Sequence, residues 1–444
     1  MSPLRLRLSL RQDDREILRL AIPAFAALIS EPLMLLADTA IIGHLGTTPL
    51  AGLAIASTVL QTFVGLCVFL AYGTTASVGR HIGAGDLRGA MATGLSGTWL
   101  ALLIGSVTAI VCAAGAPLIV TAFGTSAAVA DQAGTYLAIS AIGIPAMLIV
   151  LASTGVLRGM QDLRTPLVVM IAANVLNVIL NLLLVYGFDL GIGGAAAGTV
   201  IAQWAAAAYL LAVVVRAARA HAAPLRPHRA GISEAARAGV GLVVRTLTLR
   251  ASLLIATFVA ATQGEARLAA HQIAVTVVSF LAFALDAIAI AGQAMTGRSL
   301  GAADIEGARR TTRRMIGWGI GSGLVATGLL LALHRVMPGW FSGDSAVRDA
   351  LIPALIVVAL IQPVSGVVFV LDGVLIGAGD GTYLAKAGIV TLIAYVPLAA
   401  LVWVTGGGLV WLWLAYGGFM LARMITLVAR ERSDAWLVTG ATRT

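Results

Sequence analysis

The sequence predicts an all-α integral membrane protein with twelve transmembrane helices, arranged as two homologous six-helix bundles. Three observations carry this prediction: the composition, a series of long apolar stretches and an internal repeat. Of the 444 residues, 59% are hydrophobic and 11% are charged, whereas soluble domains are about 45 to 50% apolar and about 25% charged. We therefore expect the chain to lie in a lipid bilayer.

Twelve apolar stretches are long enough to cross a membrane, since a transmembrane helix needs about 20 mostly apolar residues. They are 18–43, 50–78, 93–119, 132–157, 165–187, 192–215, 238–261, 268–296, 315–334, 350–376, 386–405 and 408–429. The remaining loops and tails leave no room for a separate catalytic or nucleotide-binding domain of about 100 residues. The single lysine, Lys386, follows no glycine-rich run, so a phosphate-binding P-loop is not predicted. Cys67 and Cys112 lie in apolar stretches, which predicts neither a disulfide framework nor a cysteine metal site.

The basic residues predict the orientation. When alternate loops are assigned to the two sides of the membrane, 24 Arg and Lys residues, Arg423 among them, fall on one side and three on the other. Cytoplasmic loops are enriched in Lys and Arg, so we expect both termini in the cytoplasm and the chain in the cell (plasma) inner membrane. The first apolar stretch is too long for a cleavable signal peptide. The net charge of +9 is then a matter of topology, and no nucleic-acid partner is predicted.

An internal repeat is visible when the chain is compared with itself at an offset of 218 residues. The register, which has no gap, pairs Gly79-Arg80 with Gly297-Arg298, Pro145 with Pro363, Gly155 with Gly373, Gly159 with Gly377 and Asp162 with Asp380. We expect an N-lobe over 1–217, a cytoplasmic linker over 218–237, a C-lobe over 238–430 and a cytoplasmic tail over 431–444. Such parallel repeats are the plan of secondary transporters that bind substrate between the lobes near the midplane.

Few polar residues interrupt the apolar stretches of the N-lobe. Glu31 and Asp38 lie seven residues apart, which puts them on nearly the same helix face. Further along the chain, two more polar faces are formed by Asn174, Asn177 and Asn181 and by Thr199 and Gln203. Ionisable groups are costly in hydrocarbon and tend to mark the working parts of a membrane protein.

We interpret Asp38, flanked by the asparagine stripe, as the coupling-ion site. Removal from water disfavours the charged form of a carboxylate, which would let Asp38 take up and release a proton near neutral pH. The alternative is that Asp38 only bonds to Asn177 or Asn181 and joins two helices. At the offset of 218, Asp38 pairs with Ala256 and Glu31 with Leu249, so these acids are specific to the N-lobe.

The C-lobe has its own charged residues inside apolar stretches: Arg245, Arg250, Asp286 and Asp372. Arg245 lies near the end of its stretch and is expected to extend to the interface. Arg250 is deeper, and its acidic partner should be Asp286 or Asp372. Such a pair either joins helices or presents charge to a substrate in a C-lobe cavity, and the sequence does not decide between the two.

His271 is expected at a helix start, where it would cap or bond locally, and Trp403, Trp411 and Trp413 are expected in the interfacial belt. With no histidine expected inside the membrane, neither a membrane-embedded enzyme nor a metal site is predicted. We therefore expect no catalytic residue and no cofactor besides a coupling ion, H⁺ or Na⁺.

Several segments together resemble the multidrug and toxic compound extrusion (MATE) family, and more narrowly its DNA-damage-inducible (DinF-type) branch. They are 31–40 (EPLMLLADTA), 43–46 (GHLG), 157–162 (LRGMQD), 270–273 (AHQI) and 371–377 (LDGVLIG). The resemblance implies a twelve-helix antiporter with two V-arranged lobes that expels organic, often cationic, compounds in exchange for H⁺ or Na⁺. It also implies that Asp38 is the coupling residue and that Asn177, Asn181 and Thr199 line the same N-lobe pocket.

One position departs from the family. Many relatives carry a second acid where this chain has Asn181, and a hard cation such as Na⁺ prefers charged oxygen ligands. We therefore expect H⁺ coupling, with Glu31 as a replacement acid from another helix. The alternatives are a Na⁺-coupled drug antiporter and a lipid-linked precursor flippase, which would need a strongly cationic cavity. We expect a monomer whose partners are a small-molecule substrate and the lipid bilayer.

Overall fold

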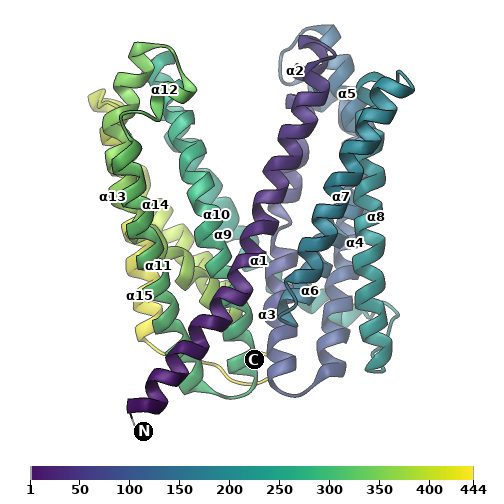
Figure 1. Ribbon diagram of the computed structural model, residues 1–444, viewed down its shortest axis with the longest axis vertical. Coiled ribbons are helices and arrows are strands. Elements are labelled where there is room, and N and C mark those ends of the chain that lie inside the picture. Colours follow the sequence, from purple (N-terminus) through teal and green to yellow (C-terminus); the bar gives the residue numbers. More distant parts are fainter. Residues whose placement is uncertain (1–2, 444) are drawn as a thin grey trace. The chain divides into compact units, whose positions relative to one another are not determined.

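The structure is a computed structural model that describes residues 3–443, with side chains from Asp14 onward, and the described residues form helices and no strands. The helices of the first half are α1 (Pro3–Gly43), α2 (Thr47–Leu66), α3 (Phe69–Gly83), α4 (Leu87–Thr121), α5 (Ala127–Ala141), α6 (Ile144–Gly159), α7 (Arg164–Leu182), the π-helix η1 (Leu183–Gly187) and α8 (Gly191–Ala220). Those of the second half are α9 (Arg229–Thr262), α10 (Glu265–Gly301), α11 (Ile305–Leu333), α12 (Pro338–Phe341), α13 (Ser345–Gly377), α14 (Gly381–Thr405) and α15 (Leu409–Arg432) (Figure 1).

The membrane-spanning segments match the twelve expected from the sequence. Within the described residues, eleven helical segments are long and apolar enough to cross a membrane, and α5 and α6 form a twelfth that is bent by 49°. The bend lies next to Gly143 and Pro145, where proline removes a backbone hydrogen-bond donor. The predicted all-α membrane fold is confirmed, and the chain is a multi-pass membrane protein.

The chain divides into two compact units, which we call the N-terminal unit (Ala26–Gly239) and the C-terminal unit (residues up to Phe25 together with Val240–Thr444). The first part of α1 therefore groups with the second half of the chain. The reason is that Arg314 donates to both carboxylate oxygens of Asp14 at 2.5 Å, and the Trp318 ring nitrogen donates to Asp14 at 2.9 Å. The segment between the repeats is also shorter than expected, because only residues 221–228 lie between α8 and α9.

The two halves repeat their helix crossings as well as their sequence. Gly155 of α6 packs on α3 so closely that a Cβ atom there would lie 2.5 Å from the carbonyl oxygen of Ala71. Gly373 of α13 packs on α10 in the same way, with 2.4 Å to the carbonyl oxygen of Ala289. The offset of 218 residues relates both members of these pairs. The glycines of the repeat are thus sites where two helices approach closely, as small residues allow in membrane proteins.

The turns before α4 and α11 are also repeated. Asp86 accepts a hydrogen bond from the backbone of Gly89 at 2.8 Å, and Asp304 accepts one from Gly307 at the same distance. These are N-caps, which satisfy one of the free donors at a helix start. The predicted capping role of both aspartates is confirmed.

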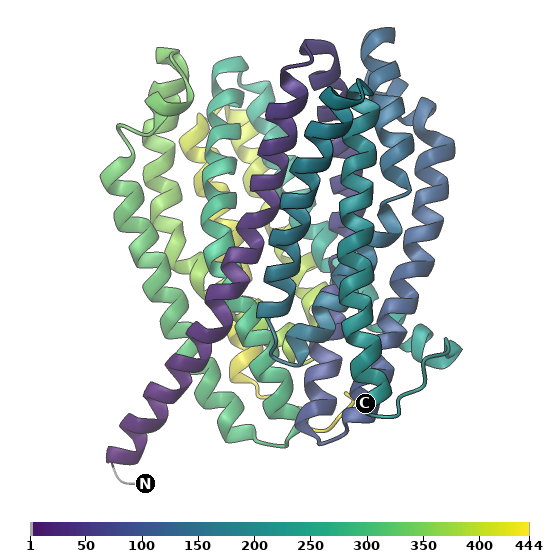
Figure 2. The same ribbon diagram turned by 45° about the vertical axis from the view of Figure 1, so that its right-hand side comes forward.

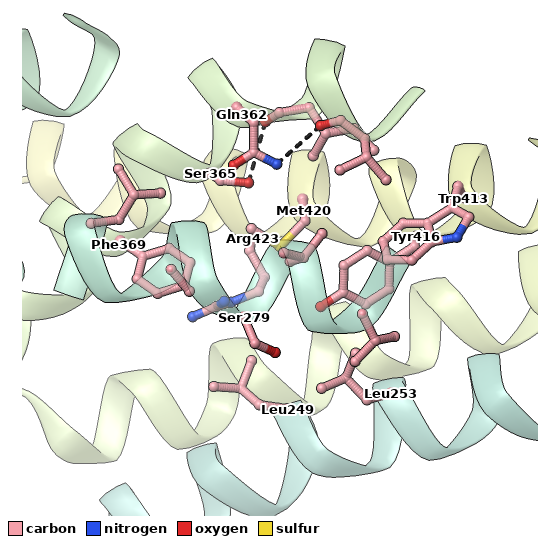
Figure 3. A pocket seen from close by; sticks show the side chains of 16 residues that line it. Leu249, Leu253, Ser279, Gln362, Ser365, Phe369, Trp413, Tyr416, Met420 and Arg423 are labelled. Atoms are coloured by element: carbon pink, nitrogen blue, oxygen red, sulfur yellow. Dashed lines mark hydrogen bonds between the residues drawn. The ribbon is translucent and has the colours of Figure 1, made fainter. Parts of the chain in front are cut away.

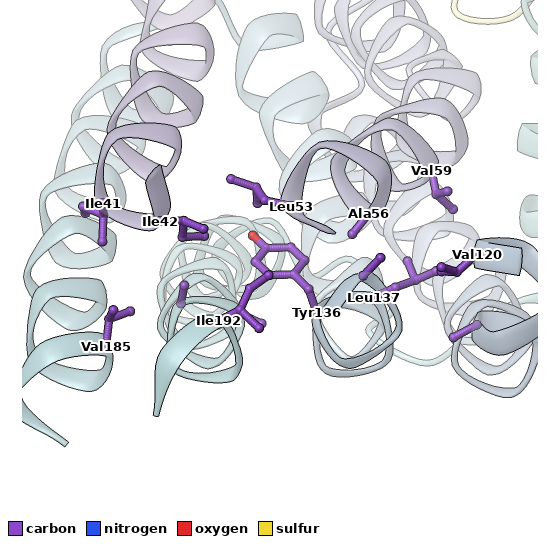
Figure 4. Packing of buried hydrophobic residues seen from close by; sticks show 14 residues of the cluster. Ile41, Ile42, Leu53, Ala56, Val59, Val120, Tyr136, Leu137, Val185 and Ile192 are labelled. Carbon is purple, nitrogen blue, oxygen red and sulfur yellow. The ribbon is translucent and has the colours of Figure 1, made fainter. Parts of the chain in front are cut away.

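In the N-terminal unit, the part of α1 after Phe25 runs beside α7 (Figure 2). A buried apolar cluster lies near one end of these helices and surrounds the ring of Tyr136, which is 4% exposed. Figure 4 shows this ring beside Ile42, Leu53 and Ile192, which come from three different helices. The cluster joins α1 to α2, α5 and α8, which are the helices that surround the candidate site.

In the C-terminal unit, α13 packs against α10, α11 and α15. The segment after α15 folds back on the same unit: Trp436 is fully buried, Gly440 donates to Leu300 O at 3.1 Å and Arg443 donates to Ala378 O at 3.0 Å. The ends of the described chain lie at the same end of this unit (Figure 1).

Candidate functional site

Four polar side chains form a continuous chain of hydrogen bonds inside the N-terminal unit. The Asn181 amide nitrogen donates to an oxygen of Asp38 at 2.7 Å and contacts the amide oxygen of Asn177 at 3.4 Å. The Asn177 amide nitrogen donates to the hydroxyl of Thr199 at 2.8 Å, and this hydroxyl donates to Ala195 O at 2.9 Å. The network therefore joins α1, α7 and α8 through the predicted carboxylate and two of the three predicted asparagines.

The network is shielded from the surroundings. Asn177 and Asn181 are fully buried, Asp38 is 3% exposed and Thr199 is 6% exposed. Buried polar groups are costly unless they are hydrogen-bonded, and in a membrane the partner must come from the protein. The amide oxygen of Asn181 is buried and has no hydrogen-bond partner. The site thus offers an unused oxygen acceptor on the residue that holds the Asp38 carboxylate.

Gly198 makes room for this arrangement. A Cβ atom at this position of α8 would lie 2.3 Å from the Asn181 amide oxygen and 3.2 Å from the Asn181 backbone nitrogen. A side chain there would push Asn181 away from Asp38. Tyr136 of α5 also belongs to the site, because its hydroxyl pairs with Thr199 and its ring lies within electrostatic range of Asp38.

The other predicted residues of the N-lobe lie further from Asp38. Asn174 donates from its amide nitrogen to the backbone oxygen of Ser30 at 2.8 Å and to the Ser30 hydroxyl at 2.7 Å, so it joins α7 to an earlier part of α1. Glu31 is exposed and lies seven residues before Asp38, about 10 Å along the helix axis. Gln203 lies one turn beyond Thr199, with its amide oxygen against Gly143 at the bend between α5 and α6.

Sequence reasoning missed Ser30, Tyr136 and Gly198. A lone serine or tyrosine in an apolar stretch carries no periodic signal, and Gly198 stands in a run of glycines and alanines. Its offset partner, Tyr416, is a large residue, and that difference between the halves was the available signal.

In the C-terminal unit, Asp372 of α13 lies between two arginines. Both the Arg245 and Arg423 guanidinium groups donate to the Asp372 carboxylate, the latter at 3.3 Å. The side chains are 15%, 10% and 5% exposed for Arg245, Arg423 and Asp372. The expectation that Arg245 extends to the interface is wrong, because it turns inward to α13. The placement of Arg423 in a surface loop is also wrong, because it lies within α15 and is 8% exposed.

Arg250 does not have the expected role. It is exposed on α9, and Asp372 pairs with Arg245 and Arg423 in its place. Asp286 of α10 is close enough to Arg423 for an electrostatic interaction. The arginine pair and the two aspartates together carry no net charge.

His271 and Trp413 are also placed differently from the expectation. His271 lies inside the membrane-spanning helix α10, is 1% exposed and contacts the Thr257 hydroxyl through Nε2 at 3.3 Å. Trp413 is 2% exposed, and its ring lies 5.6 Å from that of His271. Trp403 and Trp411 are 51% and 63% exposed. Across the described residues, no group of three His, Cys, Asp or Glu side chains is placed to hold a metal ion.

We expect Gly198→Ala to lower stability and weaken the Asn181 to Asp38 contact. The added Cβ has no space beside Asn181, and overpacking of this kind costs about 1 to 3 kcal/mol. Thermal unfolding of the purified protein in detergent measures the effect. Gly193→Ala is the matched control, because a Cβ on that residue of the same helix would have 3.6 Å or more to its neighbours. An equal melting temperature for the two variants would contradict the close contact at Gly198.

Asp372→Ala should destabilise the C-terminal unit by about 3 to 5 kcal/mol, because it leaves two buried guanidinium groups without their shared carboxylate. The control is Asp434→Ala, which removes the partner of Arg309 from an ion pair whose side chains are 46% and 40% exposed. An exposed pair contributes about 0 to 1 kcal/mol. Unfolding curves of both variants test the difference, and similar small losses would refute a structural role for Asp372.

Comparisons with known proteins assign the family. The MatE family model matches residues 23–183 and 242–404, one match in each half of the chain. DNA damage-inducible protein F of Escherichia coli (strain K12) is 29% identical over 441 residues, which cover 95% of this chain and 92% of that protein. Protein DETOXIFICATION 44, chloroplastic, of Arabidopsis thaliana is 29% identical over 436 residues, covering 95% of this chain and 83% of the relative.

Solved structures agree on the fold. The Vibrio cholerae MATE transporter VcmN in the bent form superposes with a TM-score of 0.87 at 21% identity, covering 97% of this chain and 99% of that one. A MATE crystal structure in complex with MaL6 has a TM-score of 0.85 at 20% identity and covers 96% and 97% of the two chains. The matching family and the structural neighbours are transporters, and the resemblance noted in the sequence is confirmed. The chain belongs to the MATE family of multidrug and toxic compound efflux transporters and is of the DinF type.

Proposed function

We propose that this protein exports organic, cationic or amphipathic compounds in exchange for protons, with Asp38 as the residue that carries the proton. The observation behind the proposal is the contact of Asp38 with Asn181, since it places a 3% exposed carboxylate inside a membrane span. A charged carboxylate is costly in such a place. Protonation removes the charge, and the hydrogen bond from Asn181 holds the side chain in position in either state.

Proton coupling fits the site better than Na⁺ coupling. Na⁺, as a hard cation, prefers several oxygen ligands with negative charge among them. Among the side chains of the hydrogen-bonded network, Asp38 alone is a carboxylate, and the amides of Asn177 and Asn181 bond to each other and to Thr199. Na⁺ coupling is the second candidate, supported by the unpaired amide oxygen of Asn181.

Exchange follows from a competition for negative charge. An ionised Asp38 would favour binding of an organic cation in the N-terminal unit, and protonation would favour its release, so the two ligands bind alternately. Two sites linked in this way influence each other reciprocally. Glu31 is exposed and about 10 Å from Asp38 along α1, where we propose that it adds a second negative charge for the cation.

The charges of the C-terminal unit argue against export of a lipid-linked pyrophosphate. Such a substrate would need cationic side chains free to bind phosphate. Arg245 and Arg423 instead share Asp372, and Arg423 also faces Asp286. A flippase is therefore the weaker reading of the same family architecture.

We further propose that both termini face the cytoplasm and that the protein works as a monomer in the plasma membrane. The charge distribution supports the orientation, since the loops assigned to one side hold 24 basic residues and those on the other hold three. Arg423 is buried and no longer counts toward the cytoplasmic side, which leaves 24 − 1 = 23.

Asp38→Asn should abolish efflux of a fluorescent organic cation from proteoliposomes under an imposed pH gradient, because the amide cannot exchange a proton. Asp131→Asn is the control, as it makes the same change at an exposed position of α5 in the same unit. The expected result is pH-driven efflux by the wild type and by Asp131→Asn, and none above the empty-vesicle rate by Asp38→Asn. Efflux that follows a Na⁺ gradient at constant pH would overturn proton coupling, and pH-driven efflux by Asp38→Asn would overturn the role of Asp38.

A further inference from the structure

The C-terminal unit contains an internal cavity of about 180 Å³, lined by residues of α9, α10, α13 and α15. An apolar cavity of about 150 Å³ is enough to hold benzene. The space is therefore sufficient for an aromatic ring. It lies apart from the Asp38 network, since all of its lining residues belong to the other unit.

Aromatic side chains form part of the cavity wall. Trp413 and Tyr416 lie on one side and Phe369 on the other (Figure 3). The Trp413 and Tyr416 rings pack edge to face, with centroids 5.5 Å apart. Rings attract one another in offset or edge-on arrangements, so a flat aromatic guest can find partners on more than one side. Leu249 and Leu253 of α9 close a further part of the wall.

The polar groups at the cavity are already engaged. The Gln362 amide nitrogen donates to Val358 O at 3.0 Å, and the Ser365 hydroxyl donates to Ile361 O at 3.2 Å. Arg423 lines the cavity, and its charge is balanced by Asp372 and Asp286. A guest that carried its own charge would lose its hydration without gaining an uncompensated partner, so the cavity favours an uncharged guest.

The internal repeat places this cavity beside the counterpart of the N-terminal site. The offset of 218 residues pairs Asn177 with Tyr395 and Gly198 with Tyr416. The rings of Tyr395 and Tyr416 are in contact, with centroids 6.2 Å apart. The same location in the fold thus carries an amide network in one unit and an aromatic cluster in the other.

We propose that the cavity of the C-terminal unit is a second ligand site, which takes an uncharged planar aromatic compound or the aromatic part of a larger one. This goes beyond proton-coupled export through Asp38, because the site would operate by shape and ring contacts and would not require a charge on the ligand. It also predicts that binding at the cavity is independent of the protonation of Asp38.

Binding of the fluorescent, uncharged probe 1-aminoanthracene to the purified protein in lipid nanodiscs tests the proposal. Empty nanodiscs give the background from partition into lipid. Ala282→Phe places a ring in the cavity from α10, whereas Ala400→Phe places one on the exposed face of α14. Saturable binding is expected for the wild type, Ala400→Phe and Asp38→Asn, and binding at least about tenfold weaker for Ala282→Phe, where the added ring fills the space.

Photolabelling with 1-azidoanthracene keeps the test decisive if Ala282→Phe does not fold. Label in the wild type should fall on the segments that contain Phe369, Trp413 and Tyr416, and excess 1-aminoanthracene should displace it. Probe binding that does not saturate above the empty-nanodisc background, or label confined to other segments, would overturn the proposal. Because these readouts need no ion gradient, they can succeed or fail independently of proton-coupled transport.

Discussion

The hydrogen bond from Asn181 to Asp38 determines much of the N-terminal unit. A polar group inside a membrane must find its partner within the protein, and here the partner of the α1 carboxylate comes from α7. The amide of Asn181 then requires space from α8, which Gly198 supplies. Asn177 and Thr199 continue the bonds. The position of three helices thus follows from the need to satisfy one buried carboxylate.

The two halves of the chain share a backbone plan and differ in what they enclose. The glycines of the repeat bring equivalent helices together, as Gly155 does on α3 and Gly373 on α10. Around these crossings, the N-terminal unit places amides and a carboxylate, and the C-terminal unit places aromatic rings and a neutralised charge cluster. A duplicated fold therefore provides two interiors with different chemistry, one suited to a cation or proton and the other to an apolar ring.

Periodicity and repetition made the spans, the repeat and the core of the site predictable. Asp38 and the asparagine stripe could be recognised because their spacing puts each set on one helix face. The partners of charged residues could not be predicted in this way. Whether Arg245 turns toward α13 or toward the interface depends on which helix packs beside it, and the inward position of Trp413 depends on contact with α10. These contacts join residues more than 100 positions apart, about which local sequence pattern carries no information.

The most direct test of the account is to measure proton release when an organic cation binds to the purified protein. Tetraphenylphosphonium added to the protein in weakly buffered detergent, with a pH indicator present, should release up to about one proton per molecule, since two ligands that compete for one charge are reciprocally linked. The account predicts that Asp38→Asn abolishes this release. Equal release from the variant, or binding to the wild type without any release, would contradict the assignment of Asp38 as the proton carrier.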